Sequence, residues 1–398
     1  MKRRNFLKRT SLATGGMLLV PQFLKALETG NPLALNNKKL VIIQLKGGND
    51  GLNTVVPFRN DLYYKNRGNI AINKNNILKL NDEVGFHSSL APLKNLYDEG
   101  YLSILNNVGY PNPNRSHFRS TDIWQTASDS NEFLPTGWVG RYLDITKSNP
   151  YKAIEVDESL SLMLKGYLQN GLAITNPKLF YKLLKQPFFD GVLNNYASDP
   201  HLSEHNLGYL YNTMIDARSS AKYIYEKSNT NASTANYPKN VFGKQLKTIA
   251  EFINSGLDTQ VYYAALGGFD THANQKNRQG RLLELYAESV EAFVNDLQQH
   301  NTFDDTLILT FSEFGRRVEK NGSNGTDHGA ANNVFVIGNK LQQAGIYNAL
   351  PDLQNLDANG DLKYQIDFRE VYATILDKWL DVNDRKILNK EFSKLSFI

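Results

Sequence analysis

The sequence predicts an α/β protein with a mostly parallel central sheet, helices on both faces of that sheet and a mainly helical insertion. Two observations carry this prediction. Continuous apolar, β-branched runs such as residues 40–45 (LVIIQL) are typical of strands that are buried on both faces. Runs of this kind alternate with amphipathic helical patterns, and strands that alternate with helices form parallel sheets.

The expected elements follow one another along most of the chain. Further strand-like runs are residues 102–105, 260–266, 306–311 and 333–337. Helical periodicity marks residues 90–99, 118–127, 242–254 and 281–297, and an acidic cap opens a last helix over 367–380. Residues 176–255 are mostly helical in pattern, with a polar break at 229–236, and we expect them to form the insertion.

The composition excludes several classes of protein and site. The chain has 398 residues, of which 41% are hydrophobic and 21% are charged, so it is long and apolar enough to bury a large core. It contains no Cys, which excludes disulfide scaffolds, thiolate metal sites, iron–sulfur clusters and cysteine nucleophiles. Any metal ion therefore needs His, Asp, Glu or hydroxyl ligands.

The positive net charge belongs to the first segment of the chain. The formal charge is +4, but residues 1–27 contain no acidic residue and six basic ones, so the rest holds 38 basic and 40 acidic residues. The remaining charge of −2 gives no support to a nucleic-acid or membrane role. The basic residues of this segment are Lys2, Arg3, Arg4, Lys8, Arg9 and Lys25.

The same segment resembles a bacterial twin-arginine export signal. Arg3 and Arg4 open the motif RRNFLK, and a weakly apolar stretch follows over residues 11–20. That stretch is well short of the roughly 20 residues that span a membrane, so we expect no stable membrane span. The prediction is a signal region over residues 1–29 and one domain over 30–398. The twin-arginine translocation machinery would export the folded chain to the periplasm or cell envelope.

Acidic side chains follow three of the predicted strands. Asp50 follows the first strand, Asp270 the strand that ends at residue 266, and Glu313 the strand that ends at residue 311. The carboxyl ends of parallel strands form the crevice where ligands bind. Carboxylates gathered there repel one another unless a cation lies between them, so a divalent metal ion is the simplest explanation. Asp50 in GGND is equally explained as a turn residue.

Histidines extend this candidate metal site. His272 lies two residues after Asp270, and side chains two apart in extended chain point to the same side, so both can reach one ion. Asp327 and His328 occupy a Gly- and Asn-rich loop between two predicted strands. A purely structural role remains the alternative for each of these residues.

Ser116 is the candidate nucleophile, since it lies where a loop turns into a helix. Backbone N–H groups and the positive end of a helix favour an anion there and ease the loss of a proton. A helix N-cap is the alternative role for Ser116. Arg115 and Arg119 are candidates for binding substrate oxygens by paired hydrogen bonds, or they merely solvate the helix.

Several motifs together resemble the exported bacterial proteins grouped as domain of unknown function 1501. They are QLKGGNDGLNTVVPF, NRSHFRSTDIWQTA, GGFDTHANQ, TFSEFGRR, TDHGAANNVFVIG and DFREVYATILDKWL. That family is similar to the alkaline phosphatase and sulfatase superfamily, which hydrolyses phosphate or sulfate esters at a two-metal site with a Ser, Thr or formylglycine nucleophile. The resemblance implies an alkaline-phosphatase-like fold. It also implies Asp50, Asp270, His272 and His328 as metal ligands and Ser116 as nucleophile.

The sequence departs from the superfamily pattern in two places. The strand over 306–311 ends in Ser312-Glu313-Phe314, where the superfamily usually has an Asp-His pair. One imidazole is therefore missing unless Asp327 and His328 supply it, and a single-metal or degenerate site stays open. The formylglycine pattern is absent around Ser116, which makes sulfate esters a weaker expectation than phosphate esters.

The resulting prediction is an exported metal-dependent hydrolase of anionic esters, with one or two zinc, calcium or manganese ions. The metal would neutralise charge, Ser116 or a water would attack, and Arg115 or Arg119 would hold the oxyanion. The alternative is a catalytically degenerate exported binding or assembly protein that retains the fold. The two predictions share a fold and differ in whether the site performs chemistry.

Overall fold

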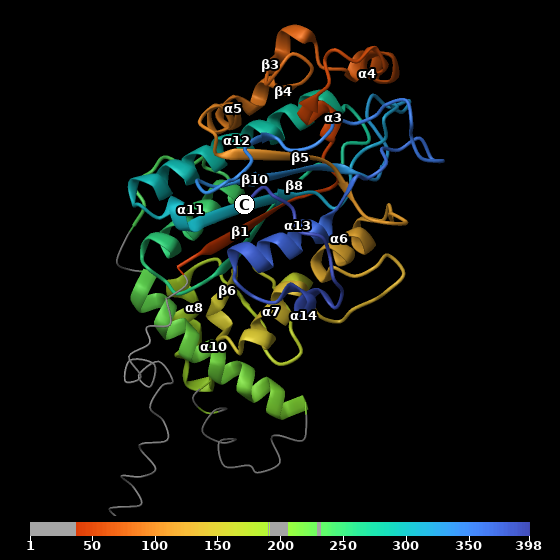
Figure 1. Cartoon of the computed structure of the whole chain (residues 1–398). Helices are drawn as coiled ribbons and strands as arrows, with labels where there is room; N and C mark the ends of the chain where they lie inside the picture. Colours follow the sequence, from red (N-terminus) through yellow and green to blue (C-terminus); the bar gives the residue numbers. More distant parts are fainter. Residues whose placement is uncertain (1–36, 190, 192–205, 229–231) are drawn as a thin grey trace, which may run out of the picture. The chain divides into compact units, whose positions relative to one another are not determined.

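A sheet of nine strands runs through the computed structural model, which describes residues 37–189, 191, 206–228 and 232–398 (Figure 1). Its central strand is the apolar run that the sequence predicted, extended by one residue at each end. The strands in spatial order are β11 (Gly345–Ile346), β5 (Leu102–Gly109), β10 (Asn332–Ile337), β9 (Thr306–Phe311), β1 (Lys39–Lys46), β8 (Val261–Gly267), β6 (Ala153–Glu155) and β7 (Leu172–Ala173). The ninth strand, β12 (Ile366–Asp367), pairs with β5.

Most neighbouring strands run parallel, as the sequence predicted. β1 pairs in parallel with β8 and β9, and β6 continues the parallel arrangement beyond β8. β10 is the exception, because it runs antiparallel to both β5 and β9. The beginning of β10 therefore lies at the same edge as the carboxyl ends of β1, β5, β8 and β9.

Alternate residues of β1 enter two separate hydrophobic cores. Leu40 and Ile42 face one core, whereas Val41, Ile43 and Leu45 face the other. Helices α5 (Ala91–Asp98), α11 (Val241–Asn254) and α12 (Gln275–Gln299) cover one face (Figure 1). Helices α6 (His117–Thr126), α7 (Trp138–Thr146), α13 (Phe368–Thr374) and α14 (Asp384–Leu388) cover the other. Burial on both faces explains why the strand sequences are apolar throughout.

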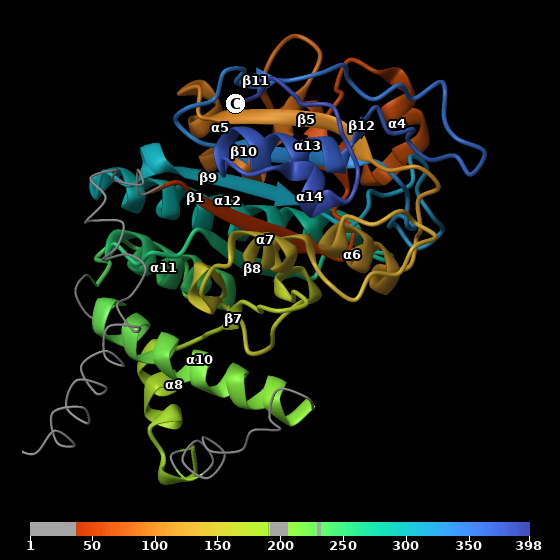
Figure 2. The same cartoon turned by 60° about the horizontal axis from the view of Figure 1, so that its bottom comes forward.

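The predicted helical insertion divides into two parts in the structure. Helices α8 (Pro177–Leu184) and α10 (Asn206–Ser228) pack against each other beyond the β7 edge of the sheet (Figure 2). α11 lies instead on the sheet, because Phe242, Leu246 and Ile249 enter the core against β8. Of the predicted polar break, residues 229–231 lie outside the described residues.

The remaining elements flank the sheet. The predicted acidic cap is Asp367, which forms a capping box with Glu370, and α13 continues into a π-helical turn over Ile375–Trp379. A small second sheet contains β2 (Val55–Val56), β4 (Gly85–His87) and β3 (Ile77–Lys79). Short helices α3 (Gly51–Thr54) and α4 (Asp61–Arg67) follow β1 and β2.

Residues from Lys38 to Ile398 form one compact unit. The predicted signal region, residues 1–29, lies outside the described residues, so export stays a prediction. Among the helices that the structure describes, none combines the length and the apolar character that crossing a membrane requires.

Candidate metal centre

Four chain segments deliver polar side chains to one edge of the sheet. Asp270 and His272 follow β8, Glu313 follows β9, and His117 begins α6 after β5. His328 precedes β10, and it reaches the same edge because that strand runs antiparallel to its neighbours. The sequence predicted that Asp50, Asp270, His272 and Glu313 would gather at this edge, and the structure adds histidines from two further segments.

The loops at this edge are held together by close backbone packing and by one buried arginine. Gly47 has φ of +117°, and a Cβ there would lie 2.4 Å from the backbone nitrogen of Asp270, so only glycine allows the approach. The buried guanidinium of Arg316 donates to the carbonyl oxygens of Gly47, of Gly48 at 2.7 Å and of Phe269 at 3.1 Å. It also donates to Oδ1 of Asp270 at 2.8 Å, which fixes that carboxylate.

Three imidazoles surround the same oxygen of Asp270. Oδ1 lies 3.0 Å from Nε2 of His272, 3.3 Å from Nε2 of His328 and 3.5 Å from Nε2 of His117. The Nε2 atoms of His272 and His328 are only 2.9 Å apart. We call these four residues the His/Asp cluster.

The opposite nitrogen of each ring faces a hydrogen-bond acceptor. Nδ1 of His117 is 2.9 Å from Oε1 of Glu313, and Nδ1 of His272 is 3.2 Å from Oδ1 of Asp327. Nδ1 of His328 is 2.7 Å from the carbonyl oxygen of Arg115. Because these oxygens accept and do not donate, each neutral ring carries its proton on Nδ1 and directs the lone pair of Nε2 toward the cluster.

The electrostatics of the cluster depend on its neighbours. Burial alone would raise the pKa of Asp270, but the hydrogen bond from Arg316 and the positive charge of that guanidinium oppose burial, and the pKa is lowered to about 2. Burial lowers the pKa of His328, whereas the hydrogen bond to Glu313 raises the pKa of His117 against the effect of its burial. Asp270 is therefore a carboxylate at neutral pH, and burial keeps the ring of His328 neutral.

The cluster has the composition and the surroundings of a metal site. His117, Asp270 and His328 offer ligand atoms within 4.8 Å of one another. Nε2 of His117 is buried and has no hydrogen-bond partner within the described residues. Imidazoles whose second nitrogen is held by a carboxylate or a carbonyl are typical of metal ligands. The residues present therefore fit a divalent transition metal such as zinc.

Asp50 is placed differently from the prediction. Its carboxylate is almost fully buried, caps α3 through the backbone N–H groups of Leu52 and Asn53, and pairs with the buried guanidinium of Arg67. The side-chain amide of Gln275 donates to the same carboxylate. The guanidinium of Arg67 thus balances the charge of this buried carboxylate.

The other predicted residues divide between two positions. Glu313 and Asp327 contact the Nδ1 atoms of His117 and His272, so they hold these rings in place. Ser116 stands at the predicted junction before α6, where it is exposed and makes no side-chain cap bond. Ser116 thus occupies the N-cap position of α6 without a capping hydrogen bond from its side chain.

The two candidate oxyanion arginines are engaged elsewhere. The guanidinium of Arg115 donates to Asp361 at 2.7 Å and to Asp357 at 3.3 Å. Arg119 donates to backbone carbonyl oxygens of residues 129, 130 and 132 and stacks over the ring of Phe133 at 3.9 Å. Both side chains therefore have partners within the chain, and their role in holding an oxyanion stays a prediction.

His117 was missed by the sequence analysis. His117 directly follows Ser116, and the sequence analysis assigned a role to that serine and none to the histidine. The signal that was available is its position, since it follows β5 in the same way that Asp270 and Glu313 follow β8 and β9. Without the strand order, β5 could not be assigned to the same edge.

Comparison with known proteins identifies a family. The model for a protein of unknown function, DUF1501, matches residues 104–391. Comparison with curated proteins found no match.

Similar solved structures include the C-terminal periplasmic domain of EcEptC from Escherichia coli in complex with Zn, with 12% identity and a TM-score of 0.36, covering 76% of this chain and 73% of that chain. The lipoteichoic acid synthase LtaP from Listeria monocytogenes has 10% identity and a TM-score of 0.37, covering 80% and 70%. The PsFucS1 sulfatase from Pseudoalteromonas sp. has 11% identity and a TM-score of 0.40, covering 90% and 70%. Likenesses this weak carry no argument about the chemistry of this chain.

Proposed function

The chain belongs to the family of proteins of unknown function DUF1501, and we propose from its own geometry that it is an exported metal-dependent hydrolase of phosphate esters. Sulfate esters are the less favoured substrates, because the formylglycine pattern is absent around Ser116. One observation carries the proposal. The Nε2 atoms of three imidazoles lie within 3.5 Å of Oδ1 of Asp270. The Nδ1 atom of each ring faces an acceptor oxygen outside the cluster.

A cation accounts for this arrangement better than a structural network does. Hydrogen bonds in a structural network pair donors with acceptors. With each neutral ring protonated at Nδ1, the three Nε2 atoms bring only acceptors to Oδ1 of Asp270, to which Arg316 alone of the residues named here donates. His117, His272, His328 and Asp270 would hold the ion, and a bound divalent metal would act as a Lewis acid toward an ester oxygen and lower the pKa of water. Glu313, Asp327 and the carbonyl of Arg115 keep the rings in the required tautomer and orientation.

We propose Ser116 as the nucleophile. It directly precedes His117 at the first turn of α6, where the backbone N–H groups of a ten-residue helix favour an anionic oxygen. Its exposed hydroxyl makes no cap bond that would have to break first. Transfer of the phosphoryl group would form a P–O bond to Oγ of Ser116, whose proton passes to water, and would break the bond to the ester oxygen, which leaves as the alcohol with a proton taken from water. A second water molecule would then attack the phosphoserine, so that inorganic phosphate leaves and the serine hydroxyl takes up a proton again.

We propose one ion per chain. Asp50, which the family resemblance implies as a further ligand, is saturated by Arg67, Gln275 and two backbone N–H groups. Arg316 supplies the second positive charge next to Asp270. Arg67 pairs with Asp50, and Arg316 pairs with Asp270. These two guanidinium groups offset the repulsion between the carboxylates, so a second ion is not needed to balance it.

Metal content and turnover test the proposal together. We expect about one zinc-class ion per chain by elemental analysis of protein that was purified without chelator, and turnover of a nitrophenyl phosphate monoester or diester. His328→Asn and His117→Asn should lose the ion and the turnover, since each removes an Nε2 ligand. His300→Asn is the matched control, because His300 contacts Asp296 outside the cluster.

The outcomes separate the two candidate functions. Loss of turnover in Ser116→Ala with the ion retained supports the hydrolase. An intact ion without turnover of phosphate or sulfate esters rejects the hydrolase and favours an exported binding protein with a structural ion. Protein that remains without metal after incubation with zinc, manganese and calcium rejects both the site and the hydrolase.

Export is a separate part of the proposal, supported by the RRNFLK motif. Arg3→Lys with Arg4→Lys should keep the chain in the cytoplasmic fraction of a host with an active twin-arginine pathway. Lys8→Arg, which leaves the arginine pair intact, is the control. Equal periplasmic recovery of both variants would exclude the twin-arginine route.

A further inference from the structure

A group of exposed apolar side chains lies on α8 and α10 and in the segments next to them. None of these residues belongs to the His/Asp cluster. Six of the eleven exposed large apolar side chains in the described residues belong to this group. Isolated exposed apolar residues are ordinary, but a cluster of them marks an interaction surface. The six are Tyr167, Leu168, Leu179, Leu183, Phe188 and Ile215.

The outer face of α8 combines this apolar character with positive charge. Leu179 and Leu183 are 54% and 44% exposed and lie four residues apart, so they occupy one stripe of the helix. Lys178 and Lys182 have the same spacing and form the adjacent stripe. On the inner side, the ring of Tyr181 stacks on a tyrosine of α10 with centroids 4.6 Å apart. α8 thus has an ordinary packed face and a second, solvent-facing face of leucine and lysine.

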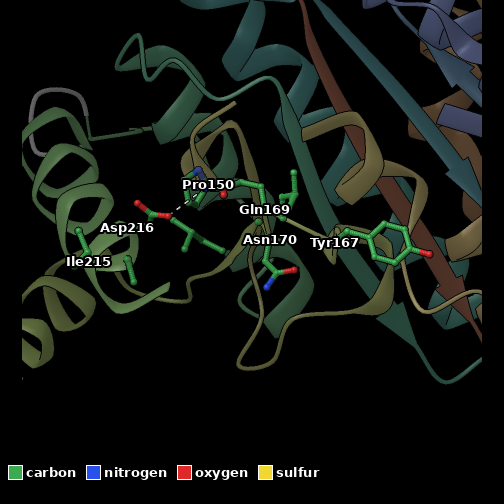
Figure 3. Close-up of a pocket in the computed structure, with 10 residues that line it drawn as sticks. Pro150, Tyr167, Gln169, Asn170, Ile215 and Asp216 are labelled. Carbon is green, nitrogen blue, oxygen red and sulfur yellow. Dashed lines mark hydrogen bonds between the residues drawn. The ribbon is translucent and has the colours of Figure 1, made fainter. Parts of the chain in front are cut away.

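The groove between the two helices repeats this chemistry. Its volume is about 430 Å³, and its lining includes Tyr181, Leu184 and Ile215 together with the cationic Lys185, Arg218 and Lys222. Among the residues that the structure describes, no acidic side chain lines this groove. Ile215 also lines a neighbouring pocket of about 400 Å³, where Asp216 accepts a hydrogen bond from Gln169 at 3.3 Å (Figure 3).

We propose that α8 and the facing side of α10 dock on the surface of an anionic lipid bilayer. Leu179, Leu183 and Phe188 would enter the boundary between headgroups and acyl chains, and the neighbouring lysines would contact anionic headgroups. The chain outside its first 27 residues has a formal charge of −2, so its overall charge does not draw it to such a surface. The local pattern of charge and apolar side chains is what fits this partner.

An indole in place of Phe188, which is 70% exposed, reports on this surface directly. The three native tryptophans are buried, so a Phe188→Trp variant of the full chain adds the exposed fluorophore. Vesicles of equimolar phosphatidylglycerol and phosphatidylcholine should shift its emission to the blue and protect it from a soluble quencher. Vesicles of phosphatidylcholine alone should do neither. If the chain sediments with the vesicles while the emission of the indole at position 188 stays unshifted, the basic first segment binds the vesicles instead, and the proposal is overturned.

Charge and apolar variants in the same background complete the test. Lys178→Glu with Lys182→Glu, and separately Leu179→Ser with Leu183→Ser, should weaken vesicle binding at least about tenfold. Lys239→Glu with Lys244→Glu is the charge-matched control, since both lysines are exposed elsewhere, and it should bind as the parent does. Equal weakening by the control pair overturns the proposal. The proposal is also overturned if the lysine or leucine variants of α8 bind vesicles as the parent does but change the oligomeric state in sedimentation velocity. A second copy of the chain would then occupy the surface.

Discussion

Nδ1 of His117 lies 2.9 Å from Oε1 of Glu313, although 196 positions of sequence separate the two residues. The same carboxylate accepts the backbone N–H of Gly47 at 2.8 Å and the side-chain amide of Gln44 at 3.3 Å. Glu313 thus connects the first strand of the sheet to the helix that carries His117. Its contacts fix the direction in which the free nitrogen of that ring points.

Replacing Glu313 is expected to weaken metal binding without removing a ligand. Glu313→Gln retains the size of the side chain but loses the negative charge that supports the ring, which typically costs 10–100-fold in metal affinity. Titration of metal-depleted protein with zinc against a competing chelator measures the change. Glu319→Gln, at an exposed position, is the control. Identical affinities for the two variants would show that Glu313 does not orient the ligand.

Asp50 is expected to act on stability and not on metal content. Asp50→Asn leaves the guanidinium of Arg67 buried without its partner, and breaking a buried ion pair costs about 3–5 kcal/mol. Urea unfolding of Asp50→Asn, Arg67→Met and the double variant measures the loss and the coupling between the two side chains. A variant that unfolds like the parent but loses its ion would restore Asp50 as a metal ligand.

Arg316 is expected to be irreplaceable by lysine. Its guanidinium contacts three loops at once through the carbonyl oxygens of Gly47, Phe269 and Thr326, and an ammonium cannot reproduce that fork. Arg316→Lys should lower the free energy of unfolding by about 3 kcal/mol or more and weaken metal binding, since Asp270 loses its anchor. Arg317→Lys, where the arginine is 41% exposed, should change stability by less than about 0.5 kcal/mol. Similar losses for both variants would contradict this role.

Glu155 is expected to make stability fall as the pH rises. Burial raises the pKa of this carboxyl from 4.5 to about 7 in the folded chain, while the unfolded chain keeps the ordinary value. Below pH 4.5 both states hold the proton, whereas above it only the folded state does. Stability is therefore lost progressively up to pH 7, by up to about 3 kcal/mol.

Glu155→Gln removes this titration. The variant should exceed the parent in unfolding free energy at pH 8, and the difference should vanish near pH 4.5, because the other titrating groups are common to both chains. Denaturant unfolding at a series of pH values measures the difference. A constant difference across the range would mean that the pKa of Glu155 is the same in the folded and the unfolded chain.

The five longest strands, several helices and part of the site followed from local pattern. The apolar run over 40–45 required burial on both faces, and β1 has it. Asp270 and His272 lie two residues apart and do contact one another, because extended chain places such side chains on one side. The start of α6 after Ser116 and the cap of α13 at Asp367 were likewise predictable from short-range chemistry.

The sequence by itself determined which segments are buried and where polar side chains leave the strands, because both depend on the period of the chain and on nearest neighbours. Only the tertiary structure decided which of those side chains meet. His328 joins the cluster because β10 runs antiparallel, and His117 joins because β5 lies next to β10. Asp50 and Asp270 are both aspartates that follow a strand of the sheet. Arg67 pairs with Asp50, whereas imidazoles surround Asp270. The packing of segments that are distant in the sequence decides which side chain lies next to each carboxylate. No local sequence pattern records that packing.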